Sequence, residues 1–342
     1  MIKVFIIDIL FKLYYLTEYN FLTKLIKITG GPIFIKLFQS MNNLLNFSDE
    51  EEMSGSVCDI IVEDNIVKKK LKINIKNDMI NSLLLFKKFL IYKNFTTPFY
   101  FEDFIKINME QVDLIKEMEY SQDLCKIFKN IKQVNVINVY FGCEDFILSD
   151  FINGERIDIF LKKPENNRYK NDIYKLLNLS YYLMIASNFF HCDWHFGNFL
   201  VNLKDNEVIL NILDTGLMSS IKEINDHNKI KNLIKTNFLK PEPINILKFL
   251  CFINKNPEAK IQNFIKNCKE INKCVALNSS YQNILVQFLK EASDNELKFP
   301  IVILFMFQSI IFLNSIEDNV YDNLKDFSDK KGFSNEIVKY LN

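Results

Sequence analysis

The segment N-F-F-H-C-D-W-H-F-G-N-F-L-V-N at residues 188–202, followed by V-I-L-N-I-L-D-T-G at residues 208–216, decides the fold of this chain. Two apolar runs joined by a charged turn at Lys204–Glu207 predict a pair of strands that carries Asp214 back towards the first segment. The resulting set of Asp193, Asn198 and Asp214 has the layout of a phosphoryl-transfer site. In such a site one acid accepts a hydroxyl proton, while an amide and a second acid hold Mg²⁺ against nucleotide phosphates.

The spacing supports this assignment, because the catalytic loop of protein kinases also places its metal-binding Asn five residues after its catalytic Asp. Two other interpretations of the segment stay open. The first treats His191 as a core histidine and Asp193 as a helix cap. The second is a zinc site, because residues of zinc-binding type cluster here, namely His191, Cys192, Asp193 and His195. The zinc site is disfavoured because no second cluster with C-x-x-C spacing accompanies it.

The composition predicts a globular protein with one large core or two packed lobes, since 49% of its 342 residues are hydrophobic. Its 42 basic and 42 acidic residues balance, so the overall charge favours no nucleic-acid partner. The seven cysteines are odd in number, scattered and never spaced as C-x-x-C, which argues against a disulfide framework. We expect a reducing, intracellular location, with the cytoplasm as the simplest choice.

The N-terminal region predicts helices rather than a targeting signal. Asp8 interrupts its apolar run and no small-residue cleavage site follows. The most apolar stretches, residues 4–15 and 300–313, are shorter than the roughly twenty residues needed to span a bilayer. Residues 2–28 have the pattern of an amphipathic helix. We expect this helix to pack on the protein, and a peripheral membrane association is the alternative.

Residues 54–75 predict a β-hairpin that could serve as a nucleotide lid, with a turn at Asp64-Asn65. Its small residues would let backbone amides approach phosphates, and we assign them to the cofactor site: Ser54, Gly55 and Ser56.

The second strand of this hairpin should present a lysine to the α- and β-phosphates. Lys72 is the first choice and Lys69 is the rival. Lys69 would place Val67 two residues earlier, where a small apolar side chain lines an adenine pocket, whereas Lys72 would place Lys70 there.

A helical segment at residues 102–130 carries Glu117, which is placed to pair with the strand lysine. Residues 134–152 predict a hairpin that ends in a polar hinge at Asn153-Gly154, and we assign Asp150, beside this hinge, to the cofactor site. The remaining residues, 157–190 and nearly everything beyond Gly216, predict helices.

With these parts in place, the sequence resembles the UbiB/aarF-domain family of atypical kinases over residues 30 to 220. The family motif G-P-x-F-I-K-x-G-Q resembles residues 31–39, G-P-I-F-I-K-L-F-Q. The family loop F-F-H-x-D-x-H-x-G-N matches residues 189–198, including His195, which ordinary protein kinases lack. The lid G-S-V-A-Q-V resembles residues 55–60, and the helix motif Q-x-D-x-x-x-E resembles Gln111, Asp113 and Glu117. The chain departs from the family at Phe38, Cys58, Asp59 and Thr215.

The resemblance implies an α+β, bilobal protein-kinase-like fold with a small β-rich N-lobe, a helical C-lobe and an N-terminal helical extension over the active site. We divide the chain into residues 1–53 (extension), 54–152 (N-lobe) and 153–342 (C-lobe). The implied function is ATP binding with Mg²⁺-dependent phosphotransferase or ATPase activity. The alternative is a nucleotide-binding pseudokinase that acts as a scaffold or switch.

The extension should also restrict the acceptor. Lys36 and Gln39, three residues apart on an otherwise apolar helix, would be costly to bury unless acids partner them. We therefore predict that both point into the nucleotide cleft, towards Asp113 and the Asp214 turn. Large protein substrates would then be excluded, leaving a small-molecule or self-directed acceptor.

Overall fold

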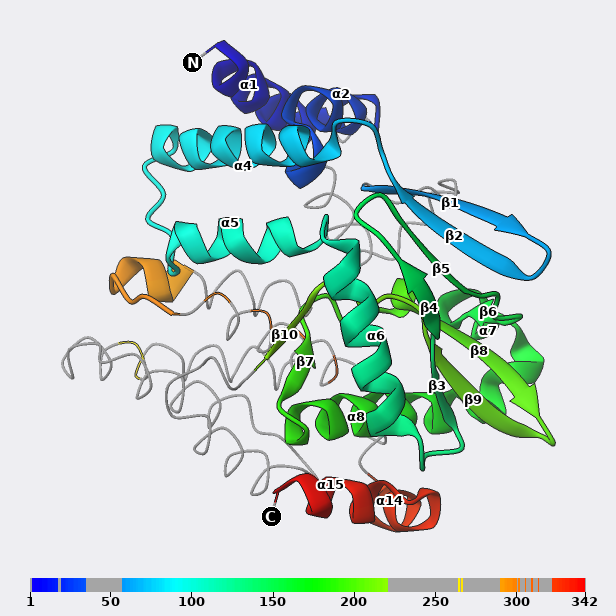
Figure 1. Ribbon diagram of the computed structural model, residues 1–342. Coiled ribbons are helices and arrows are strands. Elements are labelled where there is room, and N and C mark those ends of the chain that lie inside the picture. Colours follow the sequence, from blue (N-terminus) through cyan, green and yellow to red (C-terminus); the bar gives the residue numbers. More distant parts are fainter. Residues whose placement is uncertain are drawn as a thin grey trace.

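The chain folds into two lobes, each with its own sheet, and a helical layer covers the upper lobe (Figure 1). This computed structural model describes residues 2–17, 20–34, 57–220, 290–299 and 322–341, with single residues 264, 266, 301, 305, 309 and 313. The α+β, bilobal, kinase-like architecture expected from the sequence is therefore present.

The upper lobe is built on a four-stranded antiparallel sheet in the order β1-β2-β5-β4. Its strands are β1 (Cys58–Glu63), β2 (Ile66–Leu71), β4 (Val139–Gly142) and β5 (Phe146–Asp150). Asp64 and Asn65 both have positive φ, 49° and 62°, as a tight two-residue hairpin turn requires. The hairpin expected within residues 54–75 is confirmed for the strands and for this turn.

Three helices complete the upper lobe: α4 (Ile75–Tyr92), α5 (Phe101–Glu110) and α6 (Leu114–Phe128). The single helical segment expected at residues 102–130 is thus two helices. The break follows from capping, because the Asp113 side chain accepts a hydrogen bond from the Lys116 amide at 3.1 Å and starts α6 anew. Buried apolar residues of α4, α6 and the sheet form one core beneath the strands, including Met79, Leu83, Leu114 and Ile147.

The N-terminal helices α1 (Ile2–Thr17) and α2 (Asn20–Gly30) pack on α4. Phe34, fully buried in the helical turn after α2, packs its ring edge-on against Phe86 of α4. The Ser82 hydroxyl of α4 donates to the Gly30 carbonyl at 2.6 Å and accepts from the Ile33 amide at 3.0 Å, which fixes the end of α2. The single helix expected over residues 2–28 is thus two helices, and both pack on the protein, as expected for this segment.

Some sequence-predicted residues lie outside the described residues: Lys36, Gln39, Ser54, Gly55 and Ser56.

The lower lobe holds a second sheet in the order β3-β9-β8-β6 and a short ribbon of β7 with β10. The strands are β3 (Val134–Val136), β6 (Glu155–Arg156), β7 (Phe189–His191), β8 (Phe199–Lys204), β9 (Glu207–Ile212) and β10 (Met218–Ser220). The expected hairpin within residues 134–152 is formed by β4 and β5 alone. β3 instead pairs parallel with β9, and the chain crosses to the upper sheet where the Ile137 amide donates to the Ile212 carbonyl.

The helices of the lower lobe surround α8 (Lys170–Ala186), which is buried from Ile173 onwards. The short α7 (Ile157–Phe160) and the 3₁₀ helix Pro164–Tyr169 precede it, and α14 (Leu324–Lys331) and α15 (Phe333–Leu341) pack on it. None of the described helices is both long and apolar enough to cross a membrane.

Candidate active site

The candidate catalytic loop, residues 191–198, is joined to the D-T-G turn through the buried His191 side chain. Its Nε2 lies 2.8 Å from the Asp214 carbonyl oxygen, and its Nδ1 accepts a hydrogen bond from the Asp193 amide at 3.0 Å. Because Nδ1 is the acceptor, the proton of the neutral ring is on Nε2, which donates to Asp214. Burial lowers the pKa of His191, against the opposing effect of the Asp214 and Asp193 carboxylates, so the neutral form is favoured.

The alternative in which His191 is a core histidine is therefore right about His191, which is buried and hydrogen-bonded through both ring nitrogens. It is wrong about Asp193, which does not cap a helix. The adjacent Trp194 is buried and packs against Phe199 and His191, with ring centroids 4.5 Å and 5.6 Å away. This packing leaves the Asp193 carboxyl at the surface of the loop, where its side chain is 22% exposed.

Asn198 lies at the end of the 3₁₀ turn Phe196–Asn198, directly before β8. Its side-chain amide donates to the Asp193 carbonyl oxygen at 2.8 Å. Its own carbonyl accepts from the Leu213 amide at 3.0 Å, which places Asn198 beside the chain that enters Asp214. The structure thus brings together Asp193, Asn198 and Asp214, the three residues that the spacing selected.

An ion cluster links the two lobes at this point. The Lys69 ammonium of β2 lies 2.7 Å from Glu117 Oε1 of α6 and 3.3 Å from Asp214 Oδ1. Burial raises the pKa of Glu117, and the Lys69 charge opposes that rise. Burial also acts to raise the pKa of Asp214, but Lys69 and the Gly216 amide outweigh it and bring the pKa to about 2. The cluster therefore holds Asp214 ionised.

The choice of Lys72 as the partner of Glu117 is wrong, because Lys69 makes that ion pair. The register of β2 explains the result. Lys69 lies opposite Ile60 and Ile147 on the inner face of the sheet, whereas Lys68 lies on the outer face over the Phe146 ring. Lys72 follows the last residue of β2, where its backbone amide donates to the Val57 carbonyl.

The two residues after Asp214 hold the cluster in place, which sequence reasoning missed. Thr215 is fully buried and its hydroxyl donates to the Glu117 carbonyl at 3.0 Å. A Cβ on Gly216 would lie 2.9 Å from Glu117 Oε2 and 3.1 Å from Asp214 Oδ1, so only glycine leaves room for both carboxylates. The departure of Thr215 from the family pattern is thus compatible with an assembled site.

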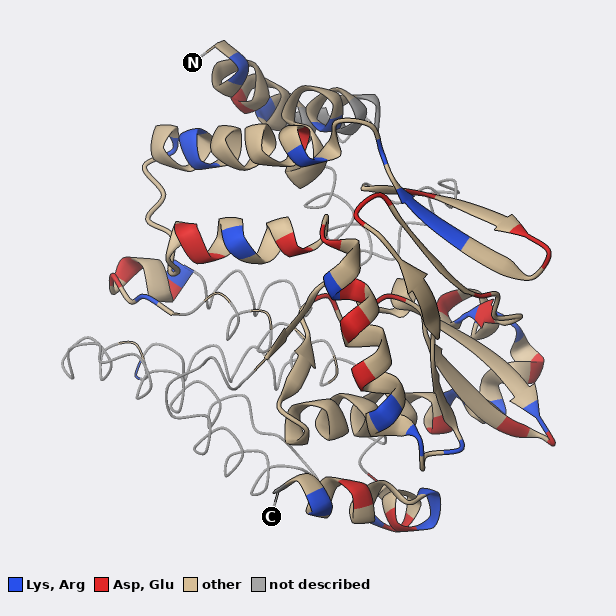
Figure 2. Cartoon of the chain, in the orientation of Figure 1, with Lys and Arg blue, Asp and Glu red and all other residues tan. Residues whose placement is uncertain are grey.

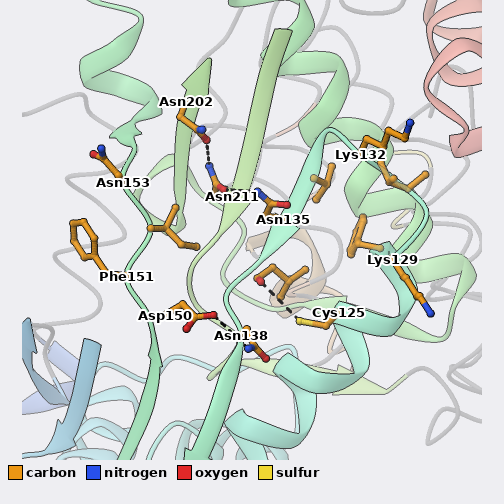
Figure 3. Close-up of a pocket in the computed structure, with 15 residues that line it drawn as sticks. Cys125, Lys129, Lys132, Asn135, Asn138, Asp150, Phe151, Asn153, Asn202 and Asn211 are labelled. Carbon is orange, nitrogen blue, oxygen red and sulfur yellow. Dashed lines mark hydrogen bonds between the residues drawn. The ribbon is translucent and has the colours of Figure 1, made fainter. Parts of the chain in front are cut away.

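Asp150 lies away from this cluster. It faces outward at the end of β5, and its Oδ2 accepts from the Asn138 side chain at 3.3 Å. Figure 3 shows it lining a separate cavity of about 530 Å³. The floor of that cavity is an amide ladder across three strands, in which Asn135 donates to Asn211 and Asn211 donates to Asn202. The Asp150 side chain is therefore not brought to the Lys69 cluster.

The free oxygens of Asn198 and Asp214 suit a hard divalent cation. Asn198 uses its amide nitrogen towards Asp193, which leaves its Oδ1 oxygen for a metal, and Asp214 has a second carboxylate oxygen besides the one bound by Lys69 and Gly216. Mg²⁺ prefers such oxygens and commonly takes only one or two protein ligands beside substrate phosphates. Both ring nitrogens of His191 are engaged by backbone groups, which disfavours this residue as a zinc ligand.

A comparison with known protein families identifies the family of this chain. A family model described as the ABC1 atypical kinase-like domain matches residues 60–242, just over half of the chain. The chain belongs to the ABC1 atypical kinase-like family. The match confirms the resemblance to the UbiB/aarF atypical kinases and covers Lys69, Glu117, Asp193 and Asp214 of this ABC1 domain.

Two solved structures are similar to this ABC1 chain. The Rv3197–erythromycin complex from Mycobacterium tuberculosis has 12% identity and a TM-score of 0.44, and the match covers 82% of this chain and 79% of that one. The gentamicin–APH(2″)-IIa complex has 10% identity and a TM-score of 0.25, with 75% and 95% covered. A search of curated proteins found no match.

Proposed function

We propose that this ABC1 domain binds ATP and acts as a Mg²⁺-dependent phosphotransferase or ATPase. The observation that carries the proposal is the Lys69–Glu117–Asp214 cluster, which joins the upper lobe to the catalytic loop through the His191 bond to Asp214. Kinase-like enzymes need a phosphate-binding lysine held by a glutamate, together with a metal-binding acid next to a proton acceptor. This cluster and Asp193 supply that set.

The adenine ring would lie under the inner face of the upper sheet. Strand register places Ile60, Val62 and Val67 on the same face as Lys69. Ile60 and Val62 are 40% and 44% exposed, so they are free to contact a ligand in this proposal. In this proposal the Lys69 ammonium contacts the phosphates, and the amides of residues 54–56, at the start of the lid, approach them as well.

Asn198 and Asp214 would hold Mg²⁺, which neutralises charge on the phosphate oxygens and aligns them when bound. The Asp193 carboxylate accepts the proton of the acceptor hydroxyl as its oxygen attacks the γ-phosphorus. The bond between that phosphorus and the β–γ bridging oxygen breaks, and ADP leaves with the electron pair. The products are ADP and a phosphorylated acceptor, or inorganic phosphate when the acceptor is water.

We propose that the phosphoryl acceptor is a small molecule or the chain itself. We also propose that residues 1–53 form the extension, residues 54–152 the N-lobe and residues 153–342 the C-lobe. The prediction that Lys36 and Gln39 point into the cleft lies outside the described residues. The described part of the extension packs on α4.

The test measures ATP turnover by the purified chain and by Asp214→Asn with Mg²⁺. The proposal predicts turnover in the wild type and a loss of at least about a hundredfold in the variant, since a metal ligand is removed. Equal residual activity in both proteins would contradict it. If Mg²⁺-ATP raises the melting temperature without turnover, the chain is a nucleotide-binding scaffold or switch.

Peripheral membrane association rests on α1, which has two apolar faces. Val4 and Ile7 are fully buried against the protein. The opposite face carries a solvent-exposed apolar stripe, and Lys3 and Lys12 of the same helix are exposed as well. Figure 2 shows basic positions along α1. The stripe consists of Ile2 (79% exposed), Phe5 (55%), Ile6 (41%), Ile9 (39%) and Leu13 (42%). An exposed apolar stripe together with exposed lysines fits an anionic lipid surface.

Vesicle flotation tests this association with phosphatidylcholine vesicles that contain or lack phosphatidylglycerol. The double variant Phe5→Ser, Ile9→Ser should lose at least about tenfold of its binding to anionic vesicles, since two apolar side chains no longer enter the membrane. Ile73→Ser is the matched control, because Ile73 is 86% exposed at a site away from α1. Equal binding by all three proteins would exclude α1 as the contact.

A further inference from the structure

His195 has a fixed orientation and a fixed tautomer. It is the residue before the 3₁₀ turn Phe196–Asn198, and its Nδ1 accepts a hydrogen bond from the Gly197 amide at 3.0 Å. A ring nitrogen that accepts carries no proton, so the neutral imidazole has its hydrogen on Nε2. The ring therefore presents an N–H donor on the side away from the turn.

That donor faces the proposed proton acceptor. His195 Nε2 lies 3.5 Å from Asp193 Oδ1, and the two side chains are 23% and 22% exposed. The distance exceeds that of a tight hydrogen bond, as is common for catalytic groups before substrate binds. Asn198 connects the two residues. Its backbone amide donates to the His195 carbonyl at 3.1 Å, and its side-chain amide donates to the Asp193 carbonyl at 2.8 Å.

The His195 ring packs against Gly197. A Cβ at Gly197 would lie 2.8 Å from His195 Cε1 and 3.0 Å from Nδ1, so any larger residue would push the imidazole out of position. The glycine is not explained by its backbone conformation, because Gly197 is not among the described residues with positive φ. Its lack of a side chain is therefore what keeps His195 against both the turn and Asp193.

We propose that His195 is a positioning residue that acts with its two ring nitrogens in two directions. Nδ1 caps the turn that presents Asn198, and Nε2–H holds the Asp193 carboxylate in the orientation that receives the acceptor proton. This inference rests on the proposed phosphotransfer function. A side chain that orients the base accelerates the reaction without contacting the nucleotide, because a misplacement of about 1 Å can cost about a hundredfold in rate.

The structural half of the proposal is tested without any activity. The chain has three histidines, so nitrogen-15 ring spectra of the full chain contain three imidazoles, which single His→Gln variants assign. At about pH 8.5, where an ordinary imidazole is neutral, His195 should show the Nε2–H tautomer. Its Nε2 resonance should shift in Asp193→Ala. The Nδ1–H tautomer, or a resonance unchanged by Asp193→Ala, would overturn the proposal.

The kinetic half uses a pair of amide variants that separates the two nitrogens. His195→Asn places an oxygen near the Nδ1 position and keeps the cap, but it lacks the distal donor. His195→Gln places an amide N–H near the Nε2 position but lacks the cap acceptor. We expect kcat to fall at least about tenfold in His195→Asn, with KM for ATP within about twofold. His195→Gln should keep a higher kcat than His195→Asn but melt at a lower temperature, because it has lost the cap. Gly197→Ala, which displaces the ring without removing it, should lower kcat as His195→Asn does.

Melting temperatures of all variants separate misfolding from a lost orientation. A rate reduced in His195→Gln but retained in folded His195→Asn would mean that the histidine only caps the turn, and the positioning role would be wrong. If the wild type has no Mg²⁺-ATP turnover while the ring spectra show the contact with Asp193, the proposed function fails and the contact stands.

Discussion

The assignment of Lys69, and not Lys72, as the ion-pair partner of Glu117 can be tested by comparing Lys69→Met with Lys72→Met. The Lys69 ammonium is 2.7 Å from Glu117 Oε1 and 3.3 Å from Asp214 Oδ1, whereas Lys72 lies beyond the end of β2. Removing Lys69 leaves Glu117, only 4% exposed, without its counter-ion. Lys69→Met should therefore destabilise the fold more than Lys72→Met does, because Lys69 is the ion-pair partner of the buried Glu117.

The size of the loss follows from the chemistry of Glu117. Removing one partner of a buried ion pair costs about 3–5 kcal/mol when the other stays charged. Glu117 can instead take up a proton, which at pH 7 costs about 3.7 kcal/mol for a group with an ordinary pKa of about 4.3. Because the cost of burying the Lys69 ammonium disappears, we expect a net loss of about 2–3 kcal/mol in the free energy of unfolding at pH 7.

The dependence on pH gives a second signature. Burial already raises the pKa of Glu117, and loss of Lys69 raises it further. A raised carboxyl pKa means that stability is retained below the unfolded pKa and lost as pH rises. The deficit of Lys69→Met should therefore shrink to about 1 kcal/mol or less at pH 5. Thermal unfolding of both variants at the two pH values measures this, and equal melting temperatures for Lys69→Met and Lys72→Met would refute the assignment.

Three further predictions test other parts of the structure. Gly216→Ala should reduce ATP turnover at least about tenfold, because its Cβ would lie 2.9 Å from Glu117 Oε2 and displace the ion cluster. Ser82→Ala should lower the free energy of unfolding by about 1–3 kcal/mol, because it leaves two buried backbone groups at the end of α2 unbonded. Asp8→Asn should lower the melting temperature near pH 7, because the buried carboxylate bonds Lys93 at 2.9 Å and Lys12 at 2.9 Å.

Each of these predictions has its own contradicting result. Unchanged kcat and KM in Gly216→Ala would show that the glycine is not needed for the cluster. An unchanged denaturation midpoint in Ser82→Ala would mean that α2 is held by apolar packing alone. The hydrogen bonds from Lys93, then Lys12, lower the pKa of Asp8, so its contribution is present above the ordinary carboxyl pKa and is lost as pH falls. A deficit in Asp8→Asn that persists at about pH 2 would contradict that origin.

The local parts of the site were predictable because they depend on short-range spacing. Asp193 and Asn198 lie on one loop, and the two apolar runs after them could form only a tight strand pair that returns Asp214 to the loop. Glu117 was selected by its place on a helix, and the structure brings it to the same cluster. These choices use spacings that the chain itself imposes within a single turn, strand pair or helix.

The assignments of Lys72 and Asp150 to the site failed because they depended on which face of a strand meets the protein. Side chains alternate along β2, so pairing with β1 and β5 decides that Lys69 points inward while its lysine neighbours do not. Four lysines in five positions carry no apolar pattern that would reveal this alternation. Asp150 is likewise next to the hinge in sequence, but the same alternation turns its side chain to the outer face.

From the sequence, the family resemblance implied the kinase-like fold class, while short-range spacing and helical periodicity selected the loop of Asp193 and Asn198 and the helix of Glu117. Only the tertiary structure decided that Lys69 completes the cluster, that β3 joins the lower sheet, and that Gly216 and Thr215 hold Glu117 in place. Each of those contacts joins residues from separate elements, up to 145 positions apart in the chain. Which of several chemically equivalent side chains meets a distant partner is settled by strand register and packing, and these depend on the whole fold.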